Sequence, residues 1–271
     1  MTDYLSKSPL GKKVAFSSSY DPSVLCPIPR APARRELGIN PDHPPFSGED
    51  VWNLWELSWL SSSGKPEVAV LELTIPAASL FIVESKSLKL YLNSLNMTRF
   101  SSGAELKNTI VQDVSKAVGA SILARLFMPE SFFRLTPAAP EGNSIDNPGS
   151  WAPQSGEILE VENKIVSEEI YSNLLRTICP VTGQPDWATI SVRYTGKKIL
   201  WASLLNYFIS LREHAGFHEN CVEMIFWKIF RECGPEKLMV KARFTRRGGI
   251  DINPFRTTEP ESAPNLRDFR Q

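Results

Sequence analysis

The stretch ICPVTGQPDWATISV, residues 178 to 192, places a thiol and a carboxylate close together in the chain. Cys179 stands beside a proline, and Asp186 follows where apolar residues begin to alternate as they do in a strand. A thiolate is a strong nucleophile, but a thiol with an ordinary pKa of about 8.5 is mostly protonated at neutral pH and needs a helper. A turn through the intervening Gly and Pro residues could bring both side chains to one ligand. The alternative is that Cys179 is a small buried hydrophobic residue and that Asp186 caps the turn.

A second group of polar residues lies in HAGFHENC, residues 214 to 221. His218 offers a proton donor, and Glu219 offers a carboxylate that can accept two parallel N–H bonds, as the edge of a purine presents them. Both residues could instead cap the helix that follows. His214, His218 and Cys221 also suggest part of a metal site, but Gly216 interrupts the helix and no fourth ligand stands at a zinc-like spacing. We therefore expect no metal.

Two basic stretches could hold phosphate groups. VESKSLKLY (83–91) places Lys86 and Lys89 near the start of an expected helix, where backbone amides and ammonium groups bind anions. FTRRGG (244–249) adds two arginines beside a flexible glycine pair. Each stretch alone is a weak signal, because short basic stretches usually form solvated faces. No G-x-G-x-x-G motif follows a strand, so a dinucleotide would be bound outside a Rossmann fold.

The elements that would carry these residues occur twice in the chain. GKPEVAVLEL (64–73) matches GQPDWATISV (183–192) at an offset of 119, SLKLYLNSLNMTRFSSG matches SLLNYFISLREHAGFHEN at 117, and ARLF matches ARFT at 118. Three matches in one order at nearly one offset favour an internal duplication. Each half reads as strand, strand, helix, helix or helical turns, strand, which predicts an α+β fold of antiparallel hairpins flanking a helical layer. In the second half we expect strands at 185–194, 199–203 and 237–245, and helices at 203–213 and 218–232.

Equivalent positions of the two halves differ in chemistry. Counted at these offsets, the pairs are Cys179 opposite Leu60, His218 opposite Ser101, Glu219 opposite Ser102, Glu84 opposite Trp201, and Lys86 opposite Ser203. Each half carries polar groups that the other lacks. We infer one site whose components are divided between two modules, so that neither half alone should work.

The length and composition limit the class of protein. With 271 residues we expect two modules: an extended proline-rich arm at 1–50, a first module at 51–134, a linker at 135–157 and a second module at 158–271. Thirty basic and thirty acidic residues give no net field to attract nucleic acid or an anionic membrane. The four cysteines are irregularly spaced, no secretory signal is visible and no apolar run reaches the roughly 20 residues of a membrane span. We expect a cytoplasmic protein with reduced thiols and a small-molecule partner.

Taken together, ESKSLKLY, CPVTGQPDWATI, FHENCVE and FTRRGGIDINP closely resemble the QueF family. These are NADPH-dependent nitrile reductases that convert 7-cyano-7-deazaguanine to 7-aminomethyl-7-deazaguanine on the way to the modified tRNA nucleoside queuosine. The resemblance covers most of the chain. It implies two tandem tunnelling-fold modules, the fold shared with GTP cyclohydrolase I, in the long form of the family that carries ESKSLK in the first module and the cysteine in the second.

The resemblance also implies a mechanism. Cys179 would add to the nitrile carbon and form a covalent thioimide, with Asp186 acting in proton transfer and His218 as a second candidate donor. Two NADPH would supply hydride, first to the thioimide and then to an imine that stays in the pocket. Because a free nitrile is a poor hydride acceptor, covalent addition divides a four-electron reduction into two smaller steps.

The same resemblance assigns the binding residues. The substrate contacts would be Val83, Glu84, Ser85, His218 and Glu219, with Glu219 on the guanine-like edge. The NADPH contacts would be Ser85, Lys86, Arg247 and Gly248. Because tunnelling folds assemble barrels from several modules, we expect a homodimer, with no metal and no direct nucleic-acid or membrane partner. Two other functions stay open: a zinc-dependent pterin or purine hydrolase of the same fold, and a purine-binding protein without catalysis.

Overall fold

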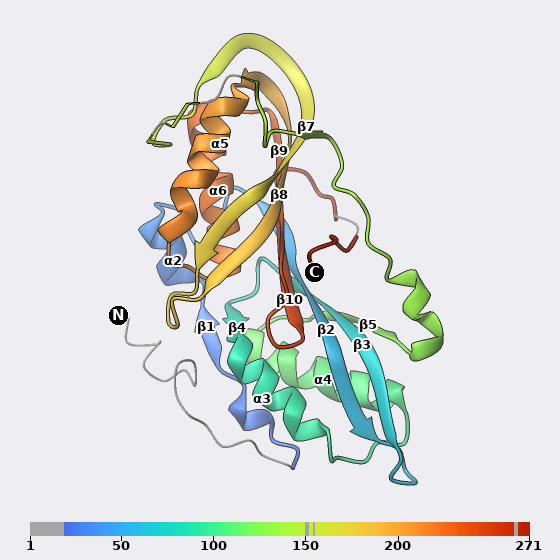
Figure 1. Ribbon diagram of the computed structural model, residues 1–271. Helices are drawn as coiled ribbons and strands as arrows, with labels where there is room; N and C mark the ends of the chain where they lie inside the picture. Colours follow the sequence, from blue (N-terminus) through green and yellow to red (C-terminus); the bar gives the residue numbers. More distant parts are fainter. Residues whose placement is uncertain (1–18, 150–151, 154, 263–264) are drawn as a thin grey trace. The chain divides into compact units, whose positions relative to one another are not determined.

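The computed structural model describes residues 19–149, 152–153, 155–262 and 265–271 (Figure 1). Within these ranges the chain forms two compact units. The first holds residues 19–32, Val51–Leu135 and Arg246–Asp251, and the second holds Ala33–Asp50, Thr136–Thr245 and Ile252–Gln271. Residues 1–18 of the predicted proline-rich arm, 150, 151 and 154 of the predicted linker, and 263–264 of the predicted second module lie outside the described residues.

The first unit combines antiparallel strands with two helices. Its sheet contains β3 (Pro66–Pro76), the edge strand β5 (Leu123–Phe127) and the part of β2 (Ser47–Leu60) that begins at Val51. Strand β3 is antiparallel to β5. A separate pair joins β1 (Pro27–Pro29) to β4 (Phe81–Val83). The helices are α3 (Ser85–Leu95) and α4 (Gly103–Val118), and the short 3₁₀ turns are η1 (Pro22–Val24) and η2 (Pro129–Arg134).

The second unit repeats this composition on a larger scale. Strand β8 (Pro185–Ile199) lies between β7 (Val161–Ile178) and β9 (Lys237–Phe244), antiparallel to both, and β10 (Ile250–Thr257) pairs with β9. The two-residue strand β6 (Asn143–Ser144) runs parallel to β7 at the edge. The helical elements are α2 (Ala31–Glu36), α5 (Trp201–Ser210), the 3₁₀ turn η3 (Leu211–Glu213) and α6 (His218–Cys233).

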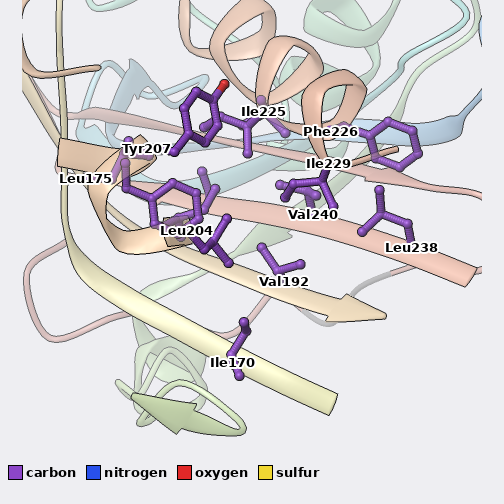
Figure 2. Close-up of a cluster of buried hydrophobic side chains, with 14 of the residues drawn as sticks. Ile170, Leu175, Val192, Leu204, Tyr207, Ile225, Phe226, Ile229, Leu238 and Val240 are labelled. Carbon is purple, nitrogen blue, oxygen red and sulfur yellow. The ribbon is translucent and has the colours of Figure 1, made fainter. Parts of the chain in front are cut away.

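The core of the second unit lies between its helices and one face of β7 to β9 (Figure 2). On α6 the buried residues recur at helical spacing: Val222, Ile225, Phe226, Ile229 and Cys233. They meet alternate strand residues such as Val192 and Val240, which are 1% and 0% exposed. Since each buried aliphatic side chain contributes about 1.5–3 kcal/mol, this interface holds α6 firmly on the sheet.

A buried ion cluster adds a second attachment for α6. Glu223 accepts hydrogen bonds from Arg34 Nε at 2.9 Å and from Arg256 Nε at 3.0 Å. Arg256 also reaches Asp50 Oδ1 at 2.8 Å. Two guanidiniums and two carboxylates thus join α2, the start of β2, α6 and β10 within the second unit.

The expected α+β class with two tandem modules is confirmed, and three details of the strand prediction are corrected. The strand predicted at 199–203 is wrong, because β8 runs without interruption to Ile199 and α5 begins at Trp201. Strands β7 and β10 were missed. The first half of β7, VENKIVSEE, is rich in charge and exposed, so its sequence lacks the apolar alternation of a half-buried strand.

The internal repeat is clear in the hydrogen bonds, which align the two units residue by residue. Ser87 Oγ donates to the Glu84 carbonyl oxygen at 2.6 Å and accepts from the Cys26 amide at 3.0 Å. In the other unit Ser203 Oγ donates to the Leu200 carbonyl oxygen at 2.9 Å and accepts from an amide at 3.0 Å. Glu84 therefore corresponds to Leu200, one residue before the Trp201 predicted from the sequence.

The other predicted equivalences also move by one or two residues. The Ser61 amide donates to the Lys65 carbonyl oxygen at 2.9 Å, and the Cys179 amide donates to the Gln184 carbonyl oxygen at the same distance. Cys179 therefore corresponds to Ser61 and not to Leu60. Helices α4 and α6 both have 16 residues and end at a left-handed glycine. His218 and Glu219 therefore correspond to Gly103 and Ala104, not to Ser101 and Ser102. The loops differ slightly in length, and short sequence matches do not locate such gaps.

No helix within the described ranges is long and apolar enough to cross a membrane.

Candidate active site

Cys179 begins the turn that joins β7 to β8. Its amide donates to the Gln184 carbonyl oxygen at 2.9 Å, and its own carbonyl oxygen accepts from the Gly183 amide at 3.0 Å. Gly183 has φ +66°, a left-handed conformation that favours glycine. Cys179 as a whole is 8% exposed. The turn therefore fixes the backbone of Cys179.

Asp186 lies on β8 directly after the same turn. It pairs in register with Thr177, two residues before Cys179 on β7, and alternate residues of a strand share a face. Its carboxylate is 3% exposed, and Oδ2 lies 3.4 Å from Nε2 of His218. The hairpin thus carries the predicted thiol at its turn and the acid on the strand that follows, and it brings the acid to the imidazole.

The first turn of α6 is anchored to the end of β7. Ile178 donates its amide to the His214 carbonyl oxygen at 2.9 Å, and the Gly216 amide donates back to the Ile178 carbonyl oxygen at 3.2 Å. His218 is the first residue of α6 and Glu219 the second. These backbone bonds bring both residues to the end of the hairpin that carries Cys179.

The remaining polar groups of this cluster are deeply buried. Glu219 is 2% exposed, and Cys221, one turn along α6, is fully buried. Burial raises the pKa of the Cys221 thiol to about 12. It also lowers the pKa of His214. The predicted core role of Cys221 and Cys233 agrees with their burial, and among the described residues no group of three His, Cys, Asp or Glu side chains is arranged to hold a metal.

The first unit carries the other predicted residues at the start of α3. Val83 ends β4, and Glu84 is the N-cap of α3, followed by Ser85 and Lys86 in its first turn. Glu84 accepts from the Lys86 amide at 2.6 Å and from the Ser87 amide at 2.8 Å. Its side chain is fully buried, and this burial raises its pKa, opposed by the two amide hydrogen bonds and by the charges of Lys89 and Lys86.

Arg247 and Gly248 lie in a tight turn of the same unit. The Arg247 amide donates to the Ile250 carbonyl oxygen at 2.9 Å, and Gly248 and Gly249 have φ +60° and +77°, as a type I′ turn requires. The turn packs on α3, because a Cβ added at Gly248 would lie 3.3 Å from Lys89 Cε. A groove between the turn and α3 is lined by Lys89, Asn93, Asn96, Gly248 and Gly249, among others.

Two residues that the sequence did not single out support these clusters. Phe244 stacks on His218 with ring centroids 3.8 Å apart and planes 3° apart. In the first unit the guanidinium carbon of Arg246 lies 4.6 Å from the centroid of the Trp55 ring. Trp55 also donates its indole N–H to the buried Asp251. Each is an apolar strand residue when seen alone, so only the stacking partner reveals its role.

The predicted site residues therefore fall into two clusters. The catalytic candidates Cys179, Asp186 and His218 lie in the second unit with Glu219. The cofactor candidates Ser85, Lys86, Arg247 and Gly248 lie in the first unit with Val83 and Glu84.

Comparison with known proteins agrees along nearly the whole chain. A family model described as nitrile reductase, 7-cyano-7-deazaguanine-reductase N-term, matches residues 16–126, and one described as QueF-like protein matches residues 185–263. A protein of Desulfotalea psychrophila, named NADPH-dependent 7-cyano-7-deazaguanine reductase, is 53% identical over 97% of each chain. Proteins of the same name from Burkholderia lata and Coxiella burnetii are 47% and 46% identical, covering 97–98% of each chain.

A solved structure titled as the archaeosine synthase QueF-Like in the apo form matches 35% of this chain and 94% of its own, with 15% identity and a TM-score of 0.30.

Proposed function

The chain belongs to the QueF family of NADPH-dependent 7-cyano-7-deazaguanine reductases, as its sequence predicted, and we propose that Cys179, Asp186 and His218 carry the chemistry of that reaction. The activity is the reduction of the nitrile of 7-cyano-7-deazaguanine to the primary amine in queuosine biosynthesis. The observation that carries the residue assignment is the hairpin of the second unit. Its turn begins at Cys179 and leads into the strand of the buried acid Asp186, and an imidazole lies 3.4 Å from that acid.

Cys179 adds its sulfur to the nitrile carbon, and the nitrogen gains a proton, which gives a thioimide. NADPH supplies the two hydrides of the overall reduction. A proton transferred to the nitrogen accompanies the first reduction, the carbon–sulfur bond then breaks to return the thiolate, and the resulting imine is reduced to the amine. Asp186 and His218 are the groups that supply protons, since both lie at the mouth of the hairpin and are shielded from bulk water. Shielding also protects the imine from hydrolysis.

Glu219 binds the guanine-like edge of the substrate. A buried carboxylate can accept the two parallel N–H groups of that edge, and this pairing offsets the cost of burying its charge. Val83, Glu84, Ser85 and His218 are the further substrate contacts that we propose.

Helix capping alone does not explain the buried carboxylate of Glu84. In the second unit the corresponding Leu200 makes the same backbone bonds with no side-chain cap within the described chain. The fold therefore tolerates an apolar residue at this position, and the buried carboxylate at Glu84 calls for another explanation. Its two oxygens have about four lone-pair sites, of which the Lys86 and Ser87 amides occupy two, so acceptors remain for a base.

NADPH is held by Ser85, Lys86, Arg247 and Gly248. The lysine at the start of α3 and the arginine of the glycine turn suit phosphate groups, and the glycine lets a phosphate approach the backbone closely. The packing of this turn on Lys89 supports the assignment, because it groups cationic side chains from two segments far apart in sequence. We further propose a metal-free homodimer in the cytoplasm, where Cys179, Cys221 and Cys233 stay as free thiols.

The test is an absorbance scan of the protein mixed with 7-cyano-7-deazaguanine in the absence of NADPH. A thioimide band is expected for the wild type and for Cys233→Ala, and none for Cys179→Ala. Cys233 is a suitable control because it ends α6, 15 residues after His218 and so about 22 Å along the helix. Addition of NADPH should remove the band and consume two equivalents per base. A band that persists in Cys179→Ala would overturn the assignment of the nucleophile.

A further inference from the structure

The imidazole of His218 is fixed on one face and one edge. Its ring stacks on Phe244 at 3.8 Å with an interplanar angle of 3°, and its Nε2 faces Asp186 at 3.4 Å. Phe244 is fully buried at the end of β9, opposite Ala188, and its carbonyl oxygen accepts from the side-chain amide of Gln271 at 2.9 Å. The platform under the imidazole is therefore rigid.

The other ring nitrogen, Nδ1, has no hydrogen-bond partner in the described part of the chain. Nδ1 of His218 is buried and makes no hydrogen bond with any residue that the structure describes. A buried polar atom without a hydrogen bond destabilises the folded state, so folded proteins retain few of them without a reason. An atom of a bound substrate would satisfy it.

The first unit shows which residues the same fold carries at these positions when no imidazole is present. There His218 corresponds to Gly103, and the strand registers place Met128 at the position of Phe244, so that a Cβ added at Gly103 would lie 3.6 Å from Met128 Sδ. The acid equivalent to Asp186 is Glu67, which is half-buried and paired with Lys65. A stacked aromatic platform is thus not a requirement of the fold, and it occurs in the unit that carries Cys179.

We propose that Phe244 is a positioning residue that holds the His218 ring so that Nδ1 donates the proton to the substrate nitrogen. The inference rests on the function proposed above and assigns the donating atom. The imidazolium gives up its Nδ1 proton, the N–H bonding pair stays on the ring, and the neutral ring keeps its proton on Nε2 toward Asp186. The partner of one ring nitrogen sets the tautomer of the other, so Asp186 selects this form and Phe244 keeps the ring in the plane where both contacts are made.

Titratable groups on several elements lie at the end of the hairpin that His218 adjoins. They are Asp186 on β8, Cys179 on the turn, Glu219 and Cys221 on α6, and His214 before α6. None of these is changed by a substitution at Phe244. A shift in the pH profile of that variant would therefore report on ring geometry and not on a lost charge.

The experiment compares Phe244→Leu, Phe244→Tyr and Phe226→Leu. Phe226 is also fully buried in the second unit but packs on Phe46 and Phe230, so Phe226→Leu removes the same ring volume away from the imidazole. The rate of thioimide formation, the dissociation constant of 7-cyano-7-deazaguanine and the pH profile of the rate are measured for each variant. The ¹⁵N shifts of His218 are assigned with His218→Asn as reference, in a chain with only three histidines.

For Phe244→Leu we expect the thioimide rate to fall about tenfold or more, with the dissociation constant changed less than about twofold, since a misplaced acid affects the chemical step. Phe244→Tyr should retain most of the rate, and Phe226→Leu all of it. At high pH the neutral wild-type ring should carry its proton on Nε2. An Nδ1–H tautomer in the wild type, or an unchanged rate in Phe244→Leu, overturns the inference. Absence of the band in the wild type would instead refute the proposed function itself.

Discussion

Replacement of Glu223 by glutamine should lower stability far more than the loss of an ordinary ion pair. Glu223 accepts four N–H donors, two from Arg34 at 2.9 and 2.8 Å and two from Arg256 at 3.0 and 2.8 Å. The three side chains are at most 4% exposed. Removing the charge takes one of the two carboxylates from a cluster that holds two buried guanidiniums, and breaking a buried pair in this way costs about 3–5 kcal/mol.

The assay is urea unfolding followed by far-ultraviolet circular dichroism. With an m value of about 2–3 kcal/mol/M, that loss lowers the midpoint by roughly 1 to 2.5 M. The matched control is Glu259→Gln in the same unit, whose pair with Lys237 is about half-exposed on both sides and should contribute less than about 1 kcal/mol. A midpoint for Glu223→Gln as high as that of the control would refute the view that this cluster fastens α6, and with it His218 and Glu219, to β10 and α2.

Two further predictions concern titratable groups. Burial raises the pKa of Glu84 above its ordinary value of 4.5. Above pH 4.5 the carboxyl group therefore binds more protons in the folded chain than in the unfolded chain. Its contribution to the free energy of unfolding is complete below pH 4.5 and declines as the pH rises through the pKa of the folded state. The urea midpoint of the wild type should therefore fall relative to that of Glu84→Gln as pH rises from 4.5, and parallel curves would contradict this. Cys221 is fully buried with a pKa of about 12, so iodoacetamide at pH 8 should modify it only after unfolding, as peptide mass spectrometry can show; rapid labelling of the folded protein would refute its burial.

Much of the architecture was readable from local patterns. The strand that contains PDWATISV and the helix that begins with HENC were predicted because apolar residues recur at the periods of a strand and a helix. The duplication was found the same way. Its register was not, because α5 and α6 are shifted by one or two residues through loop gaps, which the hydrogen bonds of Ser87 and Ser203 and the matching ends of α4 and α6 reveal. Strand β7 escaped because its exposed half carries charge, which a long antiparallel ladder tolerates.

The sequence by itself determined which chemical groups are available and which family they belong to. Motifs such as ESKSLKLY and FHENCVE keep their identity whatever the surroundings, and the relatives at 46–53% identity confirm the family that they indicated. The tertiary structure decided how those groups are arranged within each unit. Asp186, His218 and Phe244 come from three elements, and the 3.4 Å contact, the parallel stack and the unpaired Nδ1 exist only where those elements meet. Orientation and pKa depend on burial and on neighbours distant in sequence, so no local pattern carries them.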